Sequence, residues 1–280
     1  MKKFLLALTS LALAAGLTCS LVGCADQYDA EHTITVGASP EPHAQILHEI
    51  KNDLKEQGYK LVIKNFDDYI LPNTALENGE LDANYFQHTP YLNTFNEDHH
   101  TNLVAVEKIH YEPFGVFGKG VTKEQFETTK TGRTILVPND GSNLTRALFV
   151  LQDAGYIELA ADATATKNLT VNDIADKKGN TISAVEAVTV TSLLAESPNG
   201  TIAVVNGNYA IQAGYDIANA LAVESAAGEA AQLYANIIAV KKGNENSEKI
   251  QVLISALKTQ KVIDFIAREY AGAVLPVFSI

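Results

Sequence analysis

Three ring-bearing side chains gather near residue 88, where they could line a pocket for a small molecule. Phe86 and His88 share one face of a predicted strand, and Tyr91 follows on the first turn of a helix that begins at Pro90. Thr89 precedes a proline, so we expect it to be extended and to cap that helix. Ligands bind at strand ends in open α/β sheets. The pattern predicts a binding site, although core packing with a hydrogen-bonded histidine explains it equally well.

A second segment carries a side chain that could bind an anion. A predicted strand ends at residue 137, and a predicted helix begins near Ser142. Asn143 and Arg146 are three residues apart and therefore lie on one face of that helix. A guanidinium binds a carboxylate through two parallel hydrogen bonds, and a helix N-terminus favours negative charge. The segment predicts a carboxylate site. The alternative is a surface arginine paired with an acidic neighbour.

Asparagines stand at two further junctions. Asn206 follows a predicted strand at 202–205, and Asn236 opens another at 236–240. An amide offers both donors and acceptors, which suits a zwitterion because its ammonium needs acceptors and its carboxylate needs donors. Helix capping or turn formation is the alternative for both. We interpret the neighbouring Asn208 as a turn or capping residue.

The histidines give little indication of a metal site. His99 and His100 are adjacent in a polar stretch, where such pairs are usually solvated, and His43 and His48 are five apart and do not face each other on a helix. A metal site needs several histidines and a carboxylate to converge. The sequence has no Gly-x-Ser-x-Gly motif, and no pair of carboxylates stands out. We expect no catalytic residue, no cofactor and no metal site.

Strand and helix patterns alternate along the chain and would position these side chains. Strands are predicted at 33–36, 61–63, 103–109, 135–137, 202–205 and 236–240, and helices at 42–57, 142–154, 209–213 and within 247–270. This alternation predicts an α/β fold with mostly parallel sheets and helices on both faces. The segment 160–178 is predicted to form a helix–loop excursion.

Two segments are typical of crossovers between lobes, at 113–118 and 234–238. They predict a first lobe of residues 33–114 plus 235–280 and a second lobe of 115–234, with a hinge between them. Two such lobes leave a cleft, which is a common place for small ligands.

The N-terminus has the layout of an export signal. Lys2 and Lys3 precede an apolar run from 4 to 22, and a cysteine, Cys24, follows Gly23. This resembles a bacterial lipoprotein signal, which implies a signal peptide at 1–23, a lipid on Cys24 and a tether at 24–32. The alternative is a transmembrane segment, for which the run is short. We therefore expect an extracytoplasmic protein held to the membrane by lipid.

Composition excludes several function classes. The 280-residue chain has a net charge of −12, which argues against binding nucleic acid or anionic lipid surfaces. Its other cysteine, Cys19, lies inside the predicted signal, so the mature chain would have no disulfide. The length suits two moderate domains. We expect a monomer.

Taken together, these segments resemble the methionine-binding lipoproteins that serve ABC importers, the NlpA/MetQ-type family. The most specific match runs from Asp82-Ala83-Asn84 through Phe86-Gln87-His88 to Tyr91-Leu92. Weaker matches follow in the same order at 36–38, 66–69, 76–81, 103–106, 137–140, 143–148, 205–210 and 236–238.

The resemblance implies a two-lobed periplasmic-binding-protein fold of type II that closes over one amino acid. It implies a slot for the ligand side chain that is lined by Tyr69, Phe86, His88 and Tyr91. It also implies that Asn143 and Arg146 hold the ligand carboxylate, and that Asn206 and Asn236 hold the amino and carboxylate ends across the cleft. The implied ligand is L-methionine or a close relative, and the implied partners are the membrane and a permease driven by a cytoplasmic ATPase. A methionine-containing dipeptide, another amino acid or a metal ion is the alternative solute.

Overall fold

The structure is a computed structural model that describes residues 28–225 and 229–280. The predicted signal peptide, the predicted lipidation site Cys24 and the start of the predicted tether lie outside the described residues. Within the described part of the chain, no helix is both long and apolar enough to cross a membrane.

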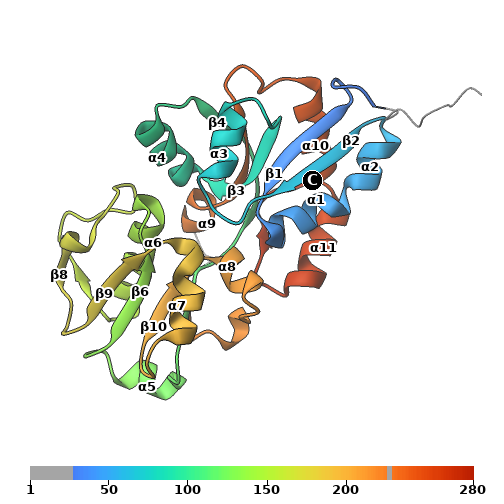
Figure 1. The fold of residues 1–280 in the computed structure, drawn as a ribbon. Coiled ribbons are helices and arrows are strands. Elements are labelled where there is room, and N and C mark those ends of the chain that lie inside the picture. The colour runs from blue at the N-terminus through green and yellow to red at the C-terminus, as the bar shows by residue number, and fades with distance from the viewer. Residues whose placement is uncertain (1–27, 226–228) are drawn as a thin grey trace, which may run out of the picture.

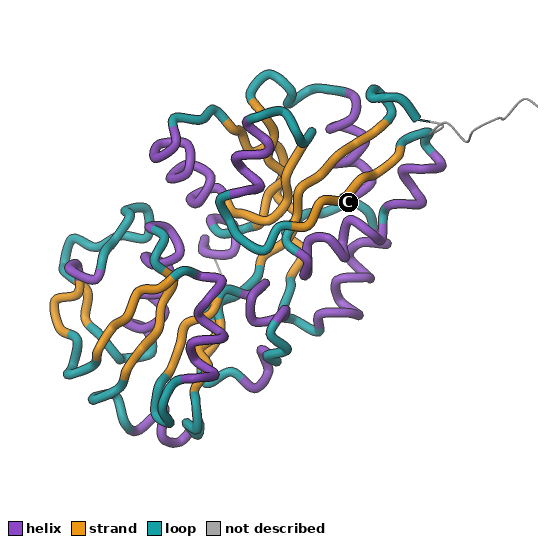
Figure 2. The backbone as a smooth tube through the Cα atoms, viewed as in Figure 1, coloured by secondary structure: helices purple, strands orange, loops and turns teal. Residues whose placement is uncertain are grey.

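The described strands form two principal sheets, which Figures 1 and 2 show as separate bodies. The first sheet has the order β13-β4-β12-β3-β1-β2. Its strands are β1 (Thr33–Ala38), β2 (Lys60–Asn65), β3 (Ala83–His88), β4 (Leu103–Tyr111), β12 (Asn236–Lys241) and β13 (Leu275–Pro276). The second has the order β11-β5-β10-β6-β9. Its strands are β5 (Gly115–Gly118), β6 (Thr134–Pro138), β9 (Thr181–Val185), β10 (Ile202–Val205) and β11 (Ala222–Val223).

Both sheets are mixed, which corrects the prediction of mostly parallel sheets. The pairs β2-β1-β3 and β10-β6-β9 are parallel, but β12 runs antiparallel to β3 and β4, and β5 runs antiparallel to β10 and β11. The antiparallel strands lie next to the two places where the chain passes from one sheet to the other. Parallel neighbours need a crossover connection, usually a helix, and a strand that enters or leaves a lobe at these places has none.

Helices cover both faces of each sheet, as predicted. They are α1 (Gln45–Glu49), α2 (Lys51–Glu56), α3 (Leu71–Glu77), α4 (Thr89–His99), α10 (Glu248–Leu257) and α11 (Gln260–Tyr270) on the first sheet, and α5 (Lys123–Thr128), α6 (Gly141–Asp153), α7 (Val190–Glu196) and α8 (Gly207–Gln212) on the second. Alternation along β3 explains the two faces, since Tyr85 packs in the core under α1 and α10 whereas Phe86 packs with α3 and α4.

Two predicted elements differ in detail. The helix predicted at 42–57 is three short pieces, a π-helical turn at Pro40–Ala44 followed by α1 and α2, which meet at Ile50. The segment predicted as a helix–loop excursion forms a 3-10 turn at Val171–Asp173 and the strand β8 (Ile174–Asp176), which pairs with β7 (Glu158–Leu159).

The chain passes between the two sheets twice. The first crossover, residues 112–114, joins β4 to β5, and the second, residues 224–235, joins β11 to β12 and contains α9 (Glu229–Leu233). Both crossovers bring polar side chains to the space between the sheets, where the candidate site lies.

Candidate ligand-binding site

A cavity that is partly open to solvent lies between the two sheets, and its empty space, open solvent included, is ≈ 320 Å³. All eight side chains that the sequence resemblance implied for the ligand line it, together with five others. The full lining is Tyr69, Phe86, Gln87, His88, Tyr91, Glu112, Phe114, Asn143, Arg146, Asn206, Gly207, Asn208 and Asn236.

One wall of the cavity is aromatic. The ring of Tyr69 lies 5.8 Å from that of Phe86 and 5.6 Å from that of Tyr91, and it stacks at 5.0 Å on Tyr209. The Tyr91 hydroxyl donates to the Tyr69 carbonyl at 3.0 Å, and the Tyr69 hydroxyl donates across the lobes to Asn208 Oδ1 at 2.6 Å. These bonds fix the rings around a slot that suits an apolar side chain.

His88 joins the lobes and also begins α4. Its Nδ1 accepts from the Tyr91 backbone N–H at 3.2 Å, so His88 is the N-cap and the prediction of a Thr89 cap is wrong. Because Nδ1 accepts, Nε2 carries the proton and donates to Asn143 Oδ1 at 3.1 Å. Burial, aided by the charge of Arg146, lowers the pKa of His88 to about 3, so the ring is neutral at pH 7.

Asn143 is positioned by the cap of its own helix. The Asp140 carboxylate accepts from the Asn143 backbone N–H at 3.0 Å and from its Nδ2 at 2.9 Å. The strand β6 ends at Pro138, and α6 then starts beside the cavity. One aspartate thus both starts the helix and orients an amide that lines the cavity.

Arg146 is already paired within the protein. Its Nε donates to both carboxylate oxygens of Glu224 at 2.8 and 2.9 Å, and its Nη2 donates to the Glu112 carbonyl at 2.6 Å. The guanidinium also lies 3.9 Å from the Phe114 ring centre. Burial raises the pKa of Glu224, but Arg146 outweighs it and holds that pKa below its usual value. The acidic neighbour considered in the sequence analysis therefore exists, although in the buried site rather than at the surface.

Two lining atoms have no hydrogen-bond partner. Among the described residues, the buried side-chain atoms without one are Asn206 Oδ1, Asn208 Nδ2 and His43 Nδ1, and the first two belong to the cavity lining. The α8 N-cap is Asn206, but its side chain makes no capping bond. The interpretation of Asn208 as a turn or capping residue missed that its amide faces the cavity and bonds Tyr69. The cavity therefore offers one unmatched acceptor and one unmatched donor.

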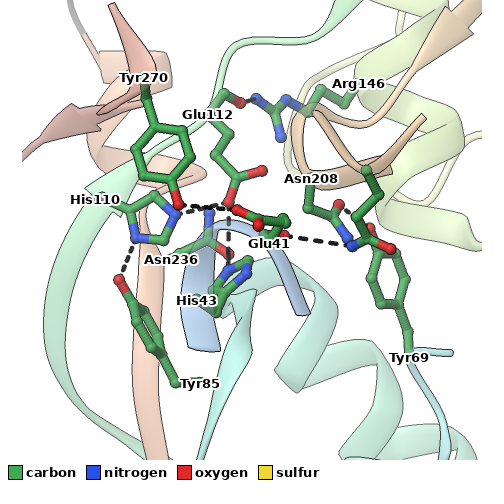
Figure 3. Close-up of polar contacts among 11 residues, drawn as sticks. Glu41, His43, Tyr69, Tyr85, His110, Glu112, Arg146, Asn208, Asn236 and Tyr270 are labelled. Atoms are coloured by element: carbon green, nitrogen blue, oxygen red, sulfur yellow. Dashed lines mark hydrogen bonds and ion pairs between the residues drawn. The ribbon is translucent and has the colours of Figure 1, made fainter. Parts of the chain in front are cut away.

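A buried carboxylate, Glu112, lies at the first crossover (Figure 3). Its Oε1 lies 2.6 Å from His110 Nε2 and 3.3 Å from His43 Nε2, and His43 Nε2 lies 2.9 Å from Asn236 Oδ1. The sequence did not predict this convergence of two histidines and a carboxylate, because residue 43 is far along the chain from residues 110 and 112. One ring nitrogen of each histidine and one carboxylate oxygen of Glu112 all lie within 4.8 Å of one another.

Two lobes, a hinge between them and a small polar and aromatic cavity at their junction define a two-lobed solute-binding protein. The chain belongs to the NlpA lipoprotein family, whose model matches residues 34–278. It is 40% identical to the methionine-binding lipoprotein MetQ of Bacillus subtilis over 87% of this chain and 88% of that protein.

Solved structures agree with this assignment. A nutrient-binding protein from Burkholderia cenocepacia bound to methionine is 33% identical, with a TM-score of 0.80 over 88% of this chain and all of that chain. An ABC-transporter periplasmic substrate-binding protein from Coxiella burnetii is 32% identical, with a TM-score of 0.78 over 87% of this chain and all of that one. Proteins of this family bind solutes and are not enzymes, so the expectation of binding without catalysis follows from membership.

Proposed function

We propose that the cavity binds a free amino acid, L-methionine or a close relative, for delivery to an ABC importer. The observation that supports this most directly is that one cavity lining contains an unmatched acceptor, Asn206 Oδ1, and an unmatched donor, Asn208 Nδ2. A buried unpaired polar atom costs about 1–3 kcal/mol, so both atoms favour a ligand that supplies the missing partners. A zwitterion supplies one ammonium and one carboxylate.

The charged side chains of the lining indicate where the ammonium and the carboxylate of the ligand would bind. Glu112 is a buried carboxylate that shares the cavity with Asn206, so the ammonium would bind there. Arg146 and Asn143 lie on α6, and with Asn208 they would bind the carboxylate. Since Glu224 occupies Nε and Nη2 of Arg146, the ligand would share this guanidinium rather than take its whole fork. Asn236 would contribute its amide beside Glu112.

The aromatic slot favours a thioether side chain. Sulfur packs well against ring edges, at about 0.3–1.5 kcal/mol per contact. Rings of Tyr69, Phe86 and Tyr91 present such edges, and two of the related proteins are a methionine-binding lipoprotein and a methionine-bound nutrient-binding protein. We therefore favour methionine over the other amino acids, and over a dipeptide or a metal ion.

The direct test is calorimetry of the soluble domain against the common L-amino acids, D-methionine, methionine-containing dipeptides and Zn²⁺. We expect L-methionine among the tightest ligands and no zinc binding, with a rise in melting temperature that grows with ligand concentration. A protein that binds no amino acid or short peptide would disprove the proposal.

Replacing Phe86 by Ala should shift preference away from methionine, because the slot loses one of its rings. We expect the ratio of methionine affinity to alanine affinity to fall. Phe278→Ala, at a partly buried ring outside the cavity lining, is the matched control. Equal losses for all amino acids would argue against a side-chain slot.

Replacing Asn208 by Ala should weaken amino-acid binding roughly tenfold, about 1.4 kcal/mol, because the carboxylate loses an N–H donor. The exposed Asn52, in α2, serves as the control for the same substitution. Binding to Asn208→Ala that equals the wild type would remove this residue from the ligand shell.

We further propose the cellular arrangement that the N-terminal pattern implies. A lipid on Cys24 would hold the protein outside the cytoplasm, as a monomer, beside a permease with a cytoplasmic ATPase. The lobes would divide at residues 114/115 and 234/235. Cys24→Ser should release the protein from the membrane fraction and remove the lipid mass, and a membrane-bound Cys24→Ser protein would contradict this arrangement.

A further inference from the structure

The buried histidine pair, His43 and His110, meets Glu112 from two separate elements (Figure 3). His43 comes from the π-helical turn after β1, and His110 comes from the end of β4. The side chains of both histidines and of Glu112 are at most 5% exposed. Glu112 lines the ligand cavity, whereas neither histidine does. The pair therefore lies behind the lining and contacts it through Glu112 and, from His43, also through Asn236.

Hydrogen bonding fixes the proton on Nε2 of both rings. His110 Nδ1 is bonded to the hydroxyl of Tyr85, which can donate to it, and this leaves Nε2–H to donate to Glu112. His43 Nε2 faces two acceptors, Asn236 Oδ1 and the Glu112 carboxylate. A lone pair on Nε2 would be repelled by both oxygens, so the proton lies there even though Nδ1 is left without a partner.

Burial keeps both rings neutral. It lowers the pKa of His43 to about 4 and that of His110 to about 3. Each ring is thus a neutral donor at pH 7, and each donor stabilises the ionised form of Glu112 against burial, which raises its pKa.

Other groups also face Glu112 from the elements packed around it. The charge of Arg146, on α6, and the backbone N–H of Asn208, on α8, favour its ionised form. Tyr270 also lies nearby, and its hydroxyl donates to Glu41 Oε2 at 3.0 Å. Glu112 shares the positive charge of Arg146 with Glu224, which is paired with that arginine. The N–H donors of the two histidines therefore matter more for keeping Glu112 ionised.

We propose that His43 and His110 are positioning residues for ligand binding, which hold Glu112 ionised and directed at the ligand ammonium. His43 also links the two crossovers, because its Nε2 contacts Glu112 in the first and Asn236 at the end of the second. This inference rests on the proposed function. A protonated Glu112 would leave the ammonium buried without a counter-charge, which is costly.

The test measures the methionine affinity between pH 5 and pH 8 for four variants, of which His43→Leu and His110→Leu remove the donor. His43→Gln and His110→Gln keep an N–H near the Nε2 position. We expect each leucine variant to bind at least tenfold more weakly at pH 6 and to recover part of that loss at pH 8, as Glu112 ionises. The glutamine variants should stay within a few-fold of the wild type. His48→Leu, an exposed histidine one helix turn away, is the control.

A second measurement needs no variant and covers the case in which the leucine variants do not fold. In wild-type protein labelled with ¹⁵N-histidine, NMR should show His43 and His110 as neutral Nε2–H tautomers at pH 7. A charged ring, or an Nδ1–H tautomer at either position, would overturn the inference.

The two proposals fail in different ways. If the wild type binds no amino acid, the proposed function is wrong. If it binds methionine but the leucine variants lose affinity equally at every pH, or lose none, the histidines do not set the charge of Glu112 and only this inference is wrong. Glu112→Gln, which cannot ionise, should bind weakly with a flat pH profile.

Discussion

At the scale of single residues, the sequence predicted Arg146 as a candidate binding residue but did not predict the residue that pairs with it. The sequence places it on one helix face with Asn143, and both line the cavity. Its principal partner, Glu224, is 78 residues away in sequence and no local pattern indicates it. The arginine is therefore both a candidate ligand contact and one half of a buried ion pair.

Arg146→Ala should act on binding and on stability together. Methionine affinity should fall more than tenfold, about 1.4 kcal/mol, and the free energy of unfolding should fall by about 3–5 kcal/mol because the largely buried Glu224 loses its counter-charge. Calorimetry and urea unfolding measure the two effects separately.

The double variant Arg146→Met/Glu224→Gln is the control for this prediction. It removes both charges, so it should recover most of the stability but not the affinity. Recovery of full affinity would show that Arg146 matters for folding alone.

At the scale of elements, the cap of α6 connects helix formation to the site. Asp140 accepts from the backbone and the side chain of Asn143. The sequence predicted that a helix begins near Ser142. It did not predict that the same carboxylate orients a lining amide, because that depends on how the turn folds back.

Asp140→Ala should cost about 1 kcal/mol of stability and also weaken methionine binding, since Asn143 loses its orientation. Asp140→Asn keeps a capping oxygen and should lose less of both. Thr122→Ala removes the comparable cap of α5, which bonds Gln125 at 3.2 Å outside the cavity, and should lower stability alone. Equal binding by Asp140→Ala and Thr122→Ala would contradict the prediction.

At the scale of the whole molecule, the buried histidines make stability depend on pH. Burial lowers the pKa values of His43, His88 and His110 to about 4, 3 and 3. Below pH 6.5 the unfolded chain takes up protons that the folded protein does not, so this stability is present above pH 6.5 and is lost as the pH falls towards 3.

We expect the free energy of unfolding to drop by up to about 1.4 kcal/mol per histidine for each pH unit below 6.5. Glu112 works in the opposite direction, because its raised pKa makes the folded state bind a proton earlier than the unfolded chain. Urea titrations at pH 7 and pH 5 measure the net effect, and His88→Gln should reduce the slope while the exposed His48→Gln should not. A wild-type stability equal at both pH values would contradict this account.

Local sequence determined much of this protein. Hydrophobic periodicity and turn residues predicted the principal strands and several helices, because each pattern records which face of an element is buried. Together with the family resemblance, it also identified eight side chains that line one cavity. These residues stand at strand ends and helix starts, which is where an α/β fold collects its ligand contacts.

Tertiary structure decided what those side chains bond to. His43 contacts Asn236 across 193 residues, and Glu112 meets both histidines only because the crossover brings it beneath them. The antiparallel strands at the crossovers have the same origin. Hydrogen bonds and ion pairs between distant segments depend on packing geometry, which periodicity along one element does not encode. The charge state of the residues in this site therefore depends on contacts that form only when the two lobes are assembled.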